Sequence, residues 1–293
     1  MRVFLTGATG FVGSAIVPEL INAGHTVLGL ARSDEGAQAL VAAGAEVHRG
    51  ELEDLESLKS GAAASDGVIH CGFVHDFSRF AEVCEIDRRA VEAIGSVLVG
   101  SDRPLVVTSG VLFLAPGRVA TEADVHSAHF PRAASEFATD ALAAQGVRAT
   151  VVRLPQVHDP YKQGLITYLI ATAREKGVSA YVGDGQSRWA AVHRLDAARV
   201  YRLALEKGAA GAKYHAVGEE GVSLRAIAES VGRGLKLPVV SKTAEEAAAH
   251  FGWMAMFLSG DCPVSSALTQ QELGWKLSGQ PSLIEDLDEA EFA

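Results

Sequence analysis

Three glycines near the start of the chain form the clearest candidate for a ligand-binding turn. The stretch LTGATGFVG places them at a G-x-x-G-x-x-G spacing, between an apolar run and an amphipathic helical pattern. Glycine permits a tight turn and close approach of the backbone to a ligand, and helix N-terminal amides bind phosphate. We expect a dinucleotide pyrophosphate to bind here, although such a turn can also serve the fold alone. The residues concerned are Gly7, Ala8, Thr9, Gly10, Phe11, Val12 and Gly13.

The end of the second apolar run indicates which dinucleotide is preferred. A site that prefers NAD carries Asp or Glu there, whereas this sequence reads Ala31-Arg32-Ser33. A carboxylate would repel a ribose 2′-phosphate, but Arg32 and Ser33 would attract one. We therefore expect NADP(H). The alternative is that Arg32 is simply a solvated residue at a strand end.

The stretch HSAHFPRAASE, residues 126–136, holds side chains suited to proton transfer and charge stabilisation. His129 could deliver a proton to a developing alkoxide, because histidine titrates near neutral pH. Arg132 stays charged, so it could stabilise the alkoxide or hold a cofactor hydroxyl. The same residues also suit an ordinary helix start with Pro131 in its first turn. On such a helix Arg132 can face the cofactor while the opposite, apolar stripe packs; that stripe is Ala134, Phe137, Ala138, Ala141 and Leu142.

The chain up to Pro155 alternates short apolar runs with helical patterns. This alternation predicts βαβ units and an α/β, doubly wound parallel sheet covered on both faces. The predicted strands cover 2–7, 25–32, 45–50, 66–72, 103–110 and 148–155, and the longest predicted helices cover 78–100 and 132–146.

After Pro155 the regular alternation of strands and helices ends, which predicts a separate, smaller lobe. Its predicted elements are helices near 162–176, 196–207 and 223–235, a loop at 179–189 and a strand at 213–217. We expect residues 1–155 to bind the cofactor and residues 156–293 to bind the substrate, with some segments of the second part returning to the first. The aromatic-rich run EEAAAHFGWMAMFLSG could be a lid over a hydrophobic substrate, but a lobe core is the more ordinary interpretation.

Composition excludes several classes of function. The 293 residues carry a net charge of −10 and no basic run, which argues against nucleic acid and anionic membranes. The three cysteines are too few and too scattered to form a disulfide framework. No apolar run is long enough to span a membrane, and the first residues resemble a strand rather than a signal peptide. We expect a cytoplasmic protein acting on a small molecule. No histidine spacing resembles a metal-ligand set, so no metal is expected.

Several motifs in series resemble the extended short-chain dehydrogenases/reductases, the NAD-dependent epimerase/dehydratase-like proteins. They are TGATGFVG, GELEDLESL, GVIHCGF, VVTSG, VVRLPQVHDP, GDGQSRWAAVHRLDAARV and SSALTQQELGW. The resemblance implies a Rossmann-type domain with a C-terminal substrate lobe that closes over the nicotinamide. It places Glu51 and Leu52 by the adenine, Cys71, Gly72 and Phe73 under the cofactor, and Leu154 and Pro155 beside the nicotinamide. Trp189, His193 and Asp196 match the motif that ties the lobes together.

The same resemblance shows where this chain departs from the family. The usual base is a Tyr with a Lys four residues later, and no tyrosine occurs before Tyr161. Atypical members carry His and Arg instead, which His129 and Arg132 resemble at a spacing of three residues. Thr108 and Ser109 match the hydroxyl position after the fifth strand, where Ser109 would hold the substrate oxygen.

These observations favour an NADPH-dependent reductase of a carbonyl or activated double bond in a small, fairly apolar molecule. The proton would come from His129, from a water or from Tyr161, and His75 and Phe77 could reach the pocket rim. Two rivals stay open: a nucleotide-sugar epimerase or dehydratase, and an NADP(H)-binding sensor without turnover. A homodimer through the 78–100 and 132–145 helices is a mild expectation.

Overall fold

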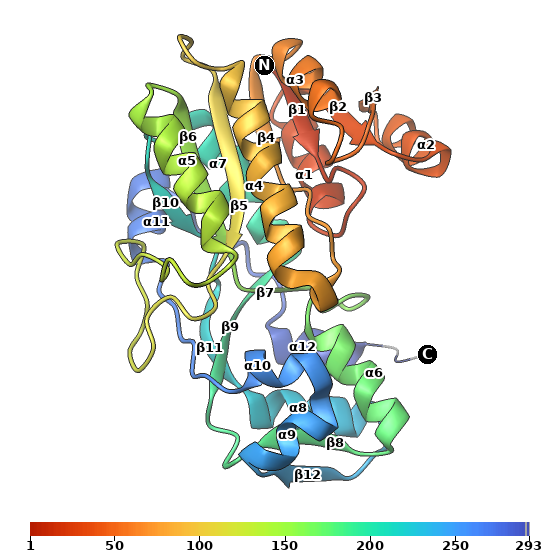
Figure 1. Ribbon diagram of the computed structural model, residues 1–293. Coiled ribbons are helices and arrows are strands. Elements are labelled where there is room, and N and C mark those ends of the chain that lie inside the picture. The colour runs from red at the N-terminus through yellow and green to blue at the C-terminus, as the bar shows by residue number, and fades with distance from the viewer. Residues whose placement is uncertain (291, 293) are drawn as a thin grey trace.

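A seven-stranded parallel sheet forms the centre of the larger part of the molecule. The computed structural model describes residues 1–290 and 292, and its main sheet has the order β10-β6-β5-β4-β1-β2-β3 (Figure 1). The predicted doubly wound α/β fold is therefore confirmed. The strands are β1 (Arg2–Thr6), β2 (Thr26–Ala31), β3 (Glu46–Arg49), β4 (Gly67–His70), β5 (Pro104–Gly110), β6 (Arg148–Leu154) and β10 (Lys213–His215).

Both faces of this sheet are covered because its strands are apolar on both sides. Val3 and Leu5 of β1 join the core beneath α1 (Gly13–Asn22) and α7 (Arg194–Lys207), whereas Phe4 joins the opposite core. Helices α3 (Leu55–Ala63), α4 (Phe80–Ser96) and α5 (Ala133–Ala144) complete that opposite core. Helix α2 (Asp34–Ala42) follows β2, and α11 (Ala267–Leu273) packs against α7. Among the described residues, no helix has the length and apolarity to cross a bilayer.

The smaller lobe is built on two short sheets. One has the order β11-β9-β7 and the other pairs β12 with β8. Figure 1 shows α6 and α8–α10 gathered around them below the main sheet. The strands are β7 (Gln156–His158), β8 (Ser179–Val182), β9 (Arg188–His193), β11 (Glu219–Ser223) and β12 (Val239–Lys242). The helices are α6 (Ile166–Lys176), α8 (Leu224–Leu235), α9 (Ala244–Phe251), α10 (Ala255–Leu258) and α12 (Leu283–Glu289), with short 3₁₀ turns η1 (Phe77–Arg79) and η2 (Gly252–Met254).

The predicted loop at 179–189 is wrong, because it contains β8 and the start of β9. The Gly-Asp-Gly turn at 183–185 favoured the prediction of a loop. The strand β8 before it is only four residues long, and its partner, β12, lies some sixty residues later in the sequence. Residues 194–215 contain α7, which packs against the main sheet, and β10, which is its edge strand. The division at residue 155 stays a prediction.

Gly61 of α3 provides a test of how tightly the helix layer packs on the sheet. A Cβ at Gly61 would lie 2.4 Å from the Phe4 ring, and the Phe4 side chain is fully buried. We expect Gly61→Val to lower the free energy of unfolding by about 2 kcal/mol, because the overpacked core must shift. Ala63→Val, on the exposed side of the same helix, is the control. Equal urea midpoints for the two variants would contradict this packing.

Candidate functional site

The glycine turn between β1 and α1 packs against the end of β4. Gly7 has φ +68°, and a Cβ there would lie 2.7 Å from the Gly72 nitrogen. A Cβ at Gly13 would lie 2.0 Å from the Gly7 carbonyl oxygen. Both positions therefore require glycine, and the turn is held close to the strand end where open parallel sheets bind ligands.

The amides of this turn are left open in a way that suits a phosphate. The Gly10 amide donates to the Gly7 carbonyl and the Ser14 amide to the Gly10 carbonyl. No acceptor for the amides of Phe11, Val12 and Gly13 is found among the described residues. Helix α1 has neither a side-chain cap nor an acidic residue in its first turn. An anion at this helix start would meet free N–H groups and the positive end of the helix dipole, so these residues fit a dinucleotide pyrophosphate.

Two cationic side chains from later in the sequence lie over the Phe11 ring of this turn. The Lys162 Nζ is 5.8 Å and the Arg194 guanidinium carbon 5.2 Å from the centroid of the Phe11 ring. Arg194 also pairs with Asp159 at 2.9 Å. Sequence analysis missed both cations, because nothing in their local sequence indicates that they approach residues 7–13. Tyr161, the alternative proton donor, is next to Lys162 but its side chain is 92% exposed.

The end of β2 places Arg32 and Ser33 beside the glycine turn. The Ser33 hydroxyl caps α2 by accepting from the Gly36 amide at 3.1 Å. A Cβ at Gly36 would lie 3.4 Å from Thr9 Cγ2, so Thr9 borders this helix start. Arg32 is exposed and has no ion-pair partner among the described residues, whereas Arg49 pairs with the nearby Asp34. The unpaired guanidinium of Arg32 therefore lies next to the capped N-terminus of α2.

The residues expected near the adenine and under the cofactor line the strand ends between these features. Leu52 lies within 2.9 Å of the position that a Gly72 Cβ would take, and Glu51 is exposed. The Gly72 amide donates to Thr6 Oγ1 at 3.1 Å. Burial raises the pKa of the Cys71 thiol to about 11, so this side chain is a neutral, apolar neighbour rather than a nucleophile.

A buried carboxylate organises the other end of the site. Asp87 of α4 accepts hydrogen bonds from Arg132 Nη1, from the Ser135 hydroxyl and from His70 Nε2, the last at 3.0 Å. Thr6 Oγ1 lies 2.8 Å from His70 Nδ1. Burial alone would raise the pKa of Asp87, but the charge of Arg132 and the His70 hydrogen bond outweigh it and hold that pKa well below its usual range.

Arg132 is fixed on every side by this arrangement. Besides Asp87, its guanidinium donates to the Thr108 carbonyl at 2.6 Å and to the Ser135 hydroxyl at 2.8 Å. It also lies 4.5 Å from the centroid of the Phe73 ring. Arg132 is thus a buried, permanently charged group beside the loop that follows β4.

Ser109 and Thr108 have different surroundings although they are neighbours on β5. Thr108 Oγ1 donates to the His70 carbonyl and lies 2.8 Å from the Tyr201 hydroxyl. The Ser109 side chain is buried, yet its hydroxyl has no hydrogen-bond partner. Buried hydroxyls are normally satisfied, so the unpaired Ser109 hydroxyl is an exception that needs an explanation. Leu154 pairs with Gly110 across the sheet, which brings Leu154 and Pro155 to the same edge.

The two histidines of the 126–136 stretch occupy opposite environments. His129 is exposed, and among the described residues only its backbone amide has a partner, Ser127. His126 is buried instead: its Nε2 lies 3.2 Å from the Leu112 carbonyl and its Nδ1 3.2 Å from Glu136. The structure therefore brings Arg132 to Asp87, whereas the His129 ring has no hydrogen-bond or ion-pair partner among the described residues.

The predicted packing of α5 is partly wrong. Phe137 is 39% exposed and Ala141 is also exposed, whereas Ser135 and Thr139 of the polar face are fully buried. The helix turns this face inward because buried Asp87 needs the donors that Arg132 and Ser135 provide. Ala138 and Leu142 are buried as expected.

Asp87 is the main functional residue that sequence analysis missed. In FAEVCEIDRRAVEAIG it falls on the buried stripe of the helix, with Val83, Ala90 and Val91 at helical spacing. A carboxylate within an apolar stripe is rarely left without partners. That pattern could have identified Asp87, but not which residues would meet it.

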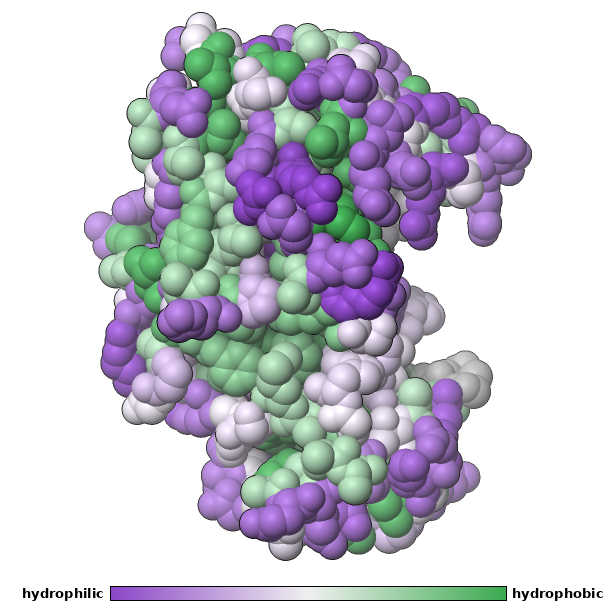
Figure 2. Space-filling model, in the orientation of Figure 1, coloured by the Kyte–Doolittle hydropathy of each residue, from purple (hydrophilic) through white to green (hydrophobic). Residues whose placement is uncertain are grey.

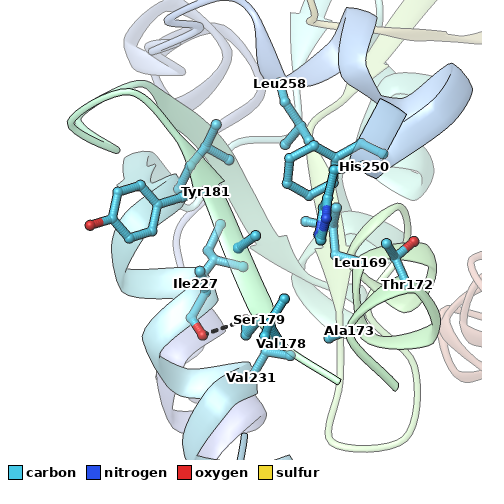
Figure 3. Close-up of a pocket in the computed structure, with 14 residues that line it drawn as sticks. Leu169, Thr172, Ala173, Val178, Ser179, Tyr181, Ile227, Val231, His250 and Leu258 are labelled. Atoms are coloured by element: carbon cyan, nitrogen blue, oxygen red, sulfur yellow. Dashed lines mark hydrogen bonds between the residues drawn. The ribbon is translucent and has the colours of Figure 1, made fainter. Parts of the chain in front are cut away.

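A small cavity in the core of the smaller lobe is not a candidate site. Figure 3 shows Leu169, Ile227, Val231 and Leu258 around it, with His250 at one side. Its volume is about 10 Å³, which is close to the smallest space that holds one water. A space of this size does not hold a small-molecule substrate.

Removal of the Asp87 charge should destabilise the fold. Asp87→Asn leaves the buried Arg132 without its counterion, so we expect the free energy of unfolding at pH 7 to fall by about 3 kcal/mol. Because the folded-state pKa of Asp87 lies below its ordinary value of 3.8, its stabilisation is complete above pH 4 and is lost as pH falls further. Urea titrations should show wild-type stability falling more steeply than that of Asp87→Asn below pH 4. Parallel curves would contradict the assignment, and Glu92→Gln on the exposed face of α4 is the control.

Comparison with known proteins agrees with this geometry. The chain is 52% identical over 279 residues to uncharacterized protein C2A9.02 of Schizosaccharomyces pombe, covering 94% of this chain and 95% of that protein. It is 29% identical to a 4-hydroxy-2-methyl-3-oxo-4-farnesyl-3,4-dihydroquinoline-1-oxide ketoreductase of Stigmatella aurantiaca, over 90% of this chain and 84% of the relative.

A solved structure shows the same fold at low sequence identity. The dTDP-glucose 4,6-dehydratase DesIV of Streptomyces venezuelae, as a double mutant with NAD and DAU bound, superposes with a TM-score of 0.78 at 21% identity. The match covers 99% of this chain and 96% of that one. The family model described as NAD dependent epimerase/dehydratase family matches residues 3–218. This protein therefore belongs to the NAD-dependent epimerase/dehydratase family, in an atypical form without the Tyr-x-x-x-Lys pair.

Proposed function

We propose that the protein is an NADP(H)-dependent reductase of a carbonyl or activated double bond in a small, fairly apolar molecule. The observation that carries this proposal is that the carboxyl end of β5 holds both a buried Ser109 hydroxyl without a partner and the Thr108 carbonyl to which the fixed Arg132 donates. One group can donate a hydrogen bond to a substrate oxygen, and the other stabilises negative charge on it. The ketoreductase relative supports the same class of reaction.

Each residue of the site has a distinct role in this scheme. The bound cofactor would supply the hydride. Ser109 would orient the substrate oxygen, and Arg132 would stabilise the alkoxide without giving up a proton, since its pKa stays above any working pH. The returning proton would come from water or from His129, which is exposed.

The preference for NADP(H) rests on the end of β2. Exposed Arg32 and the hydroxyl of Ser33 would bind the 2′-phosphate, while Lys162 and Arg194 would add positive charge near the pyrophosphate. Asp34 lies in the same helix turn, but its charge is neutralised by Arg49.

A nucleotide-sugar epimerase or dehydratase is the second candidate, favoured by the family match. Those reactions rely on a tyrosine base, and the stretch HSAHFPR holds no tyrosine but an exposed His129. The present site offers an orienting hydroxyl and a fixed cation, but no tyrosine on this helix. Reduction therefore fits it better.

Cofactor preference can be measured by fluorescence of the reduced cofactors. NADPH should bind at micromolar concentrations and more tightly than NADH. We expect Arg32→Ala to weaken NADPH binding roughly tenfold and NADH binding less than twofold, because one charge-assisted contact to the phosphate is lost. Arg225→Ala, an exposed arginine of the small lobe, is the matched control. Equal affinity for both cofactors in the wild type would contradict NADP(H) specificity.

The roles of Ser109 and Arg132 can be separated from folding. Since the Ser109 hydroxyl has no partner, Ser109→Ala should unfold at the same urea concentration as the wild type yet lower kcat for NADPH-dependent ketone reduction about 100-fold. Arg132→Lys keeps the positive charge but loses the planar guanidinium, which donates several hydrogen bonds in a fixed geometry. We therefore expect a smaller loss of kcat, about tenfold. Unchanged turnover in both variants would refute the assignment. NADPH binding without turnover of any ketone, aldehyde or enone would instead support a sensor, and turnover of a nucleotide sugar would support the epimerase.

A further inference from the structure

A series of buried hydrogen bonds connects the glycine turn with Arg132. Thr6 and His70 are the last residues of the neighbouring strands β1 and β4, and they are register partners. Thr6 Oγ1 lies 2.8 Å from His70 Nδ1, and His70 Nε2 lies 3.0 Å from Asp87 Oδ1. The Asp87 carboxylate in turn binds Arg132. We call these four residues the buried network. Because Thr6 directly precedes Gly7, the network begins at the glycine turn and ends at the fixed guanidinium.

The direction of each bond in the buried network is determined by its partners. Thr6 Oγ1 accepts from the Gly72 amide at 3.1 Å, so its own hydrogen is available for His70 Nδ1. That nitrogen then carries no hydrogen, and His70 Nε2 donates to the Asp87 carboxylate. This arrangement gives every polar side-chain atom of Thr6, His70 and Asp87 a partner, and these residues are at most 1% exposed. The hydrogen bonds therefore assign His70 to its Nε2–H tautomer.

A second route joins His70 to Arg132. The Arg132 guanidinium donates to the Thr108 carbonyl at 2.6 Å, and the Thr108 hydroxyl donates to the His70 carbonyl at 2.8 Å. His70 thus holds Arg132 through its side chain, by way of Asp87, and through its backbone, by way of Thr108. Arg132 cannot shift without breaking a buried hydrogen bond on one of these routes, which costs free energy.

The outer face of α4 provides no other partner for the buried carboxylate. Figure 2 shows strongly hydrophilic residues gathered over this helix. On that face Arg88 pairs with Glu85 and Glu92, whereas Asp87 belongs to the buried residues of the helix. Among the described residues, Asp87 Oδ1 accepts a hydrogen bond from His70 alone. Loss of that donor would leave a buried carboxylate oxygen without a partner.

Arg132 is the member of the buried network that keeps donors for a ligand. A guanidinium carries five N–H groups, and the bonds to Asp87, Ser135 and Thr108 use three of them. No acceptor for Nε or for the second hydrogen of Nη2 is found among the described residues. Arg132 is 9% exposed, so it is also the most accessible residue of the network.

We propose that His70 is a positioning residue, which sets the place of the Arg132 charge relative to the glycine turn. This proposal rests on the reductase function proposed above, in which the turn holds the cofactor and Arg132 stabilises the substrate oxygen. Hydride transfer requires the nicotinamide and that oxygen in a fixed mutual position, and a misplacement of about 1 Å can lower the rate roughly a hundredfold. His70 touches neither group and acts through Asp87 and Thr108.

Two substitutions at His70 separate positioning from packing. His70→Phe keeps an aromatic ring but removes both nitrogens, whereas His70→Gln keeps one acceptor and one donor. Per folded enzyme, we expect His70→Phe to lower kcat for NADPH-dependent ketone reduction about 20-fold, with KM and NADPH affinity changed by no more than roughly threefold. His70→Gln should restore kcat to within roughly threefold of the wild type, because it can bind both Thr6 and Asp87.

Gly61→Val is the matched control, since it strains the core at Phe4 without changing any residue of the buried network. The folded fraction of every variant is measured by circular dichroism at the assay temperature. Per folded enzyme, kcat of Gly61→Val should stay within about twofold of the wild type, because packing strain alone moves no hydrogen bond of the network. A loss of kcat as large as in His70→Phe, or wild-type kcat in His70→Phe, would overturn the proposal.

A second readout does not depend on turnover. In the full protein with ¹⁵N-labelled histidine, the His70 signals, identified by their loss in His70→Gln, should show a protonated Nε2 and an unprotonated Nδ1. Thr6→Val removes the hydroxyl that fixes this tautomer and should shift these signals, while Thr6→Ser should keep them.

The outcomes distinguish this proposal from the proposed function. A protonated Nδ1 of His70 in the wild type would overturn the proposal even if ketones are reduced. Absence of NADPH binding or of ketone turnover in the wild type would overturn the proposed function, and the proposal with it, whatever the tautomer of His70.

Discussion

The ionised carboxylate of Asp87, buried between the sheet and two helices, is the constraint that shapes this site. A charge without water must be met by donors, and here His70, Arg132 and Ser135 converge on it from β4, from the start of α5 and from its first turn. That requirement turns the polar face of α5 inward and fixes Arg132 beside Phe73 and the Thr108 carbonyl. The position of Arg132 therefore follows from the fold itself, since its partners lie on the sheet and on α4 and α5.

A fixed arginine gives a different kind of active site from a Tyr-Lys pair. Arginine stabilises negative charge but exchanges no proton, so a reaction that needs a strong base gains little from it. Hydride transfer to a carbonyl needs mainly stabilisation of the alkoxide, and the proton can arrive from solvent.

Much of the fold could be predicted from the sequence, because local patterns report local structure. Apolar runs, the glycine turn and the Arg32-Ser33 strand end all follow from short stretches, and the parallel sheet follows from their alternation. Contacts between distant segments left no such trace: β8 pairs with β12, Lys162 and Arg194 approach Phe11, and Asp87 meets Arg132. The His129 assignment rested on the resemblance and on the titration range of histidine, and it stays a prediction; the structure leaves His129 exposed and buries His126.

The central claim is that the open amides at the start of α1 bind the pyrophosphate of a phosphorylated nicotinamide dinucleotide. A crystal structure of the protein with NADPH tests this most directly. The account predicts phosphate oxygens within hydrogen-bonding distance of the Phe11, Val12 or Gly13 amides, the 2′-phosphate against Arg32, and the nicotinamide facing Ser109. Clear density for NADPH at any other place, or no density at the glycine turn at saturating concentration, would contradict it.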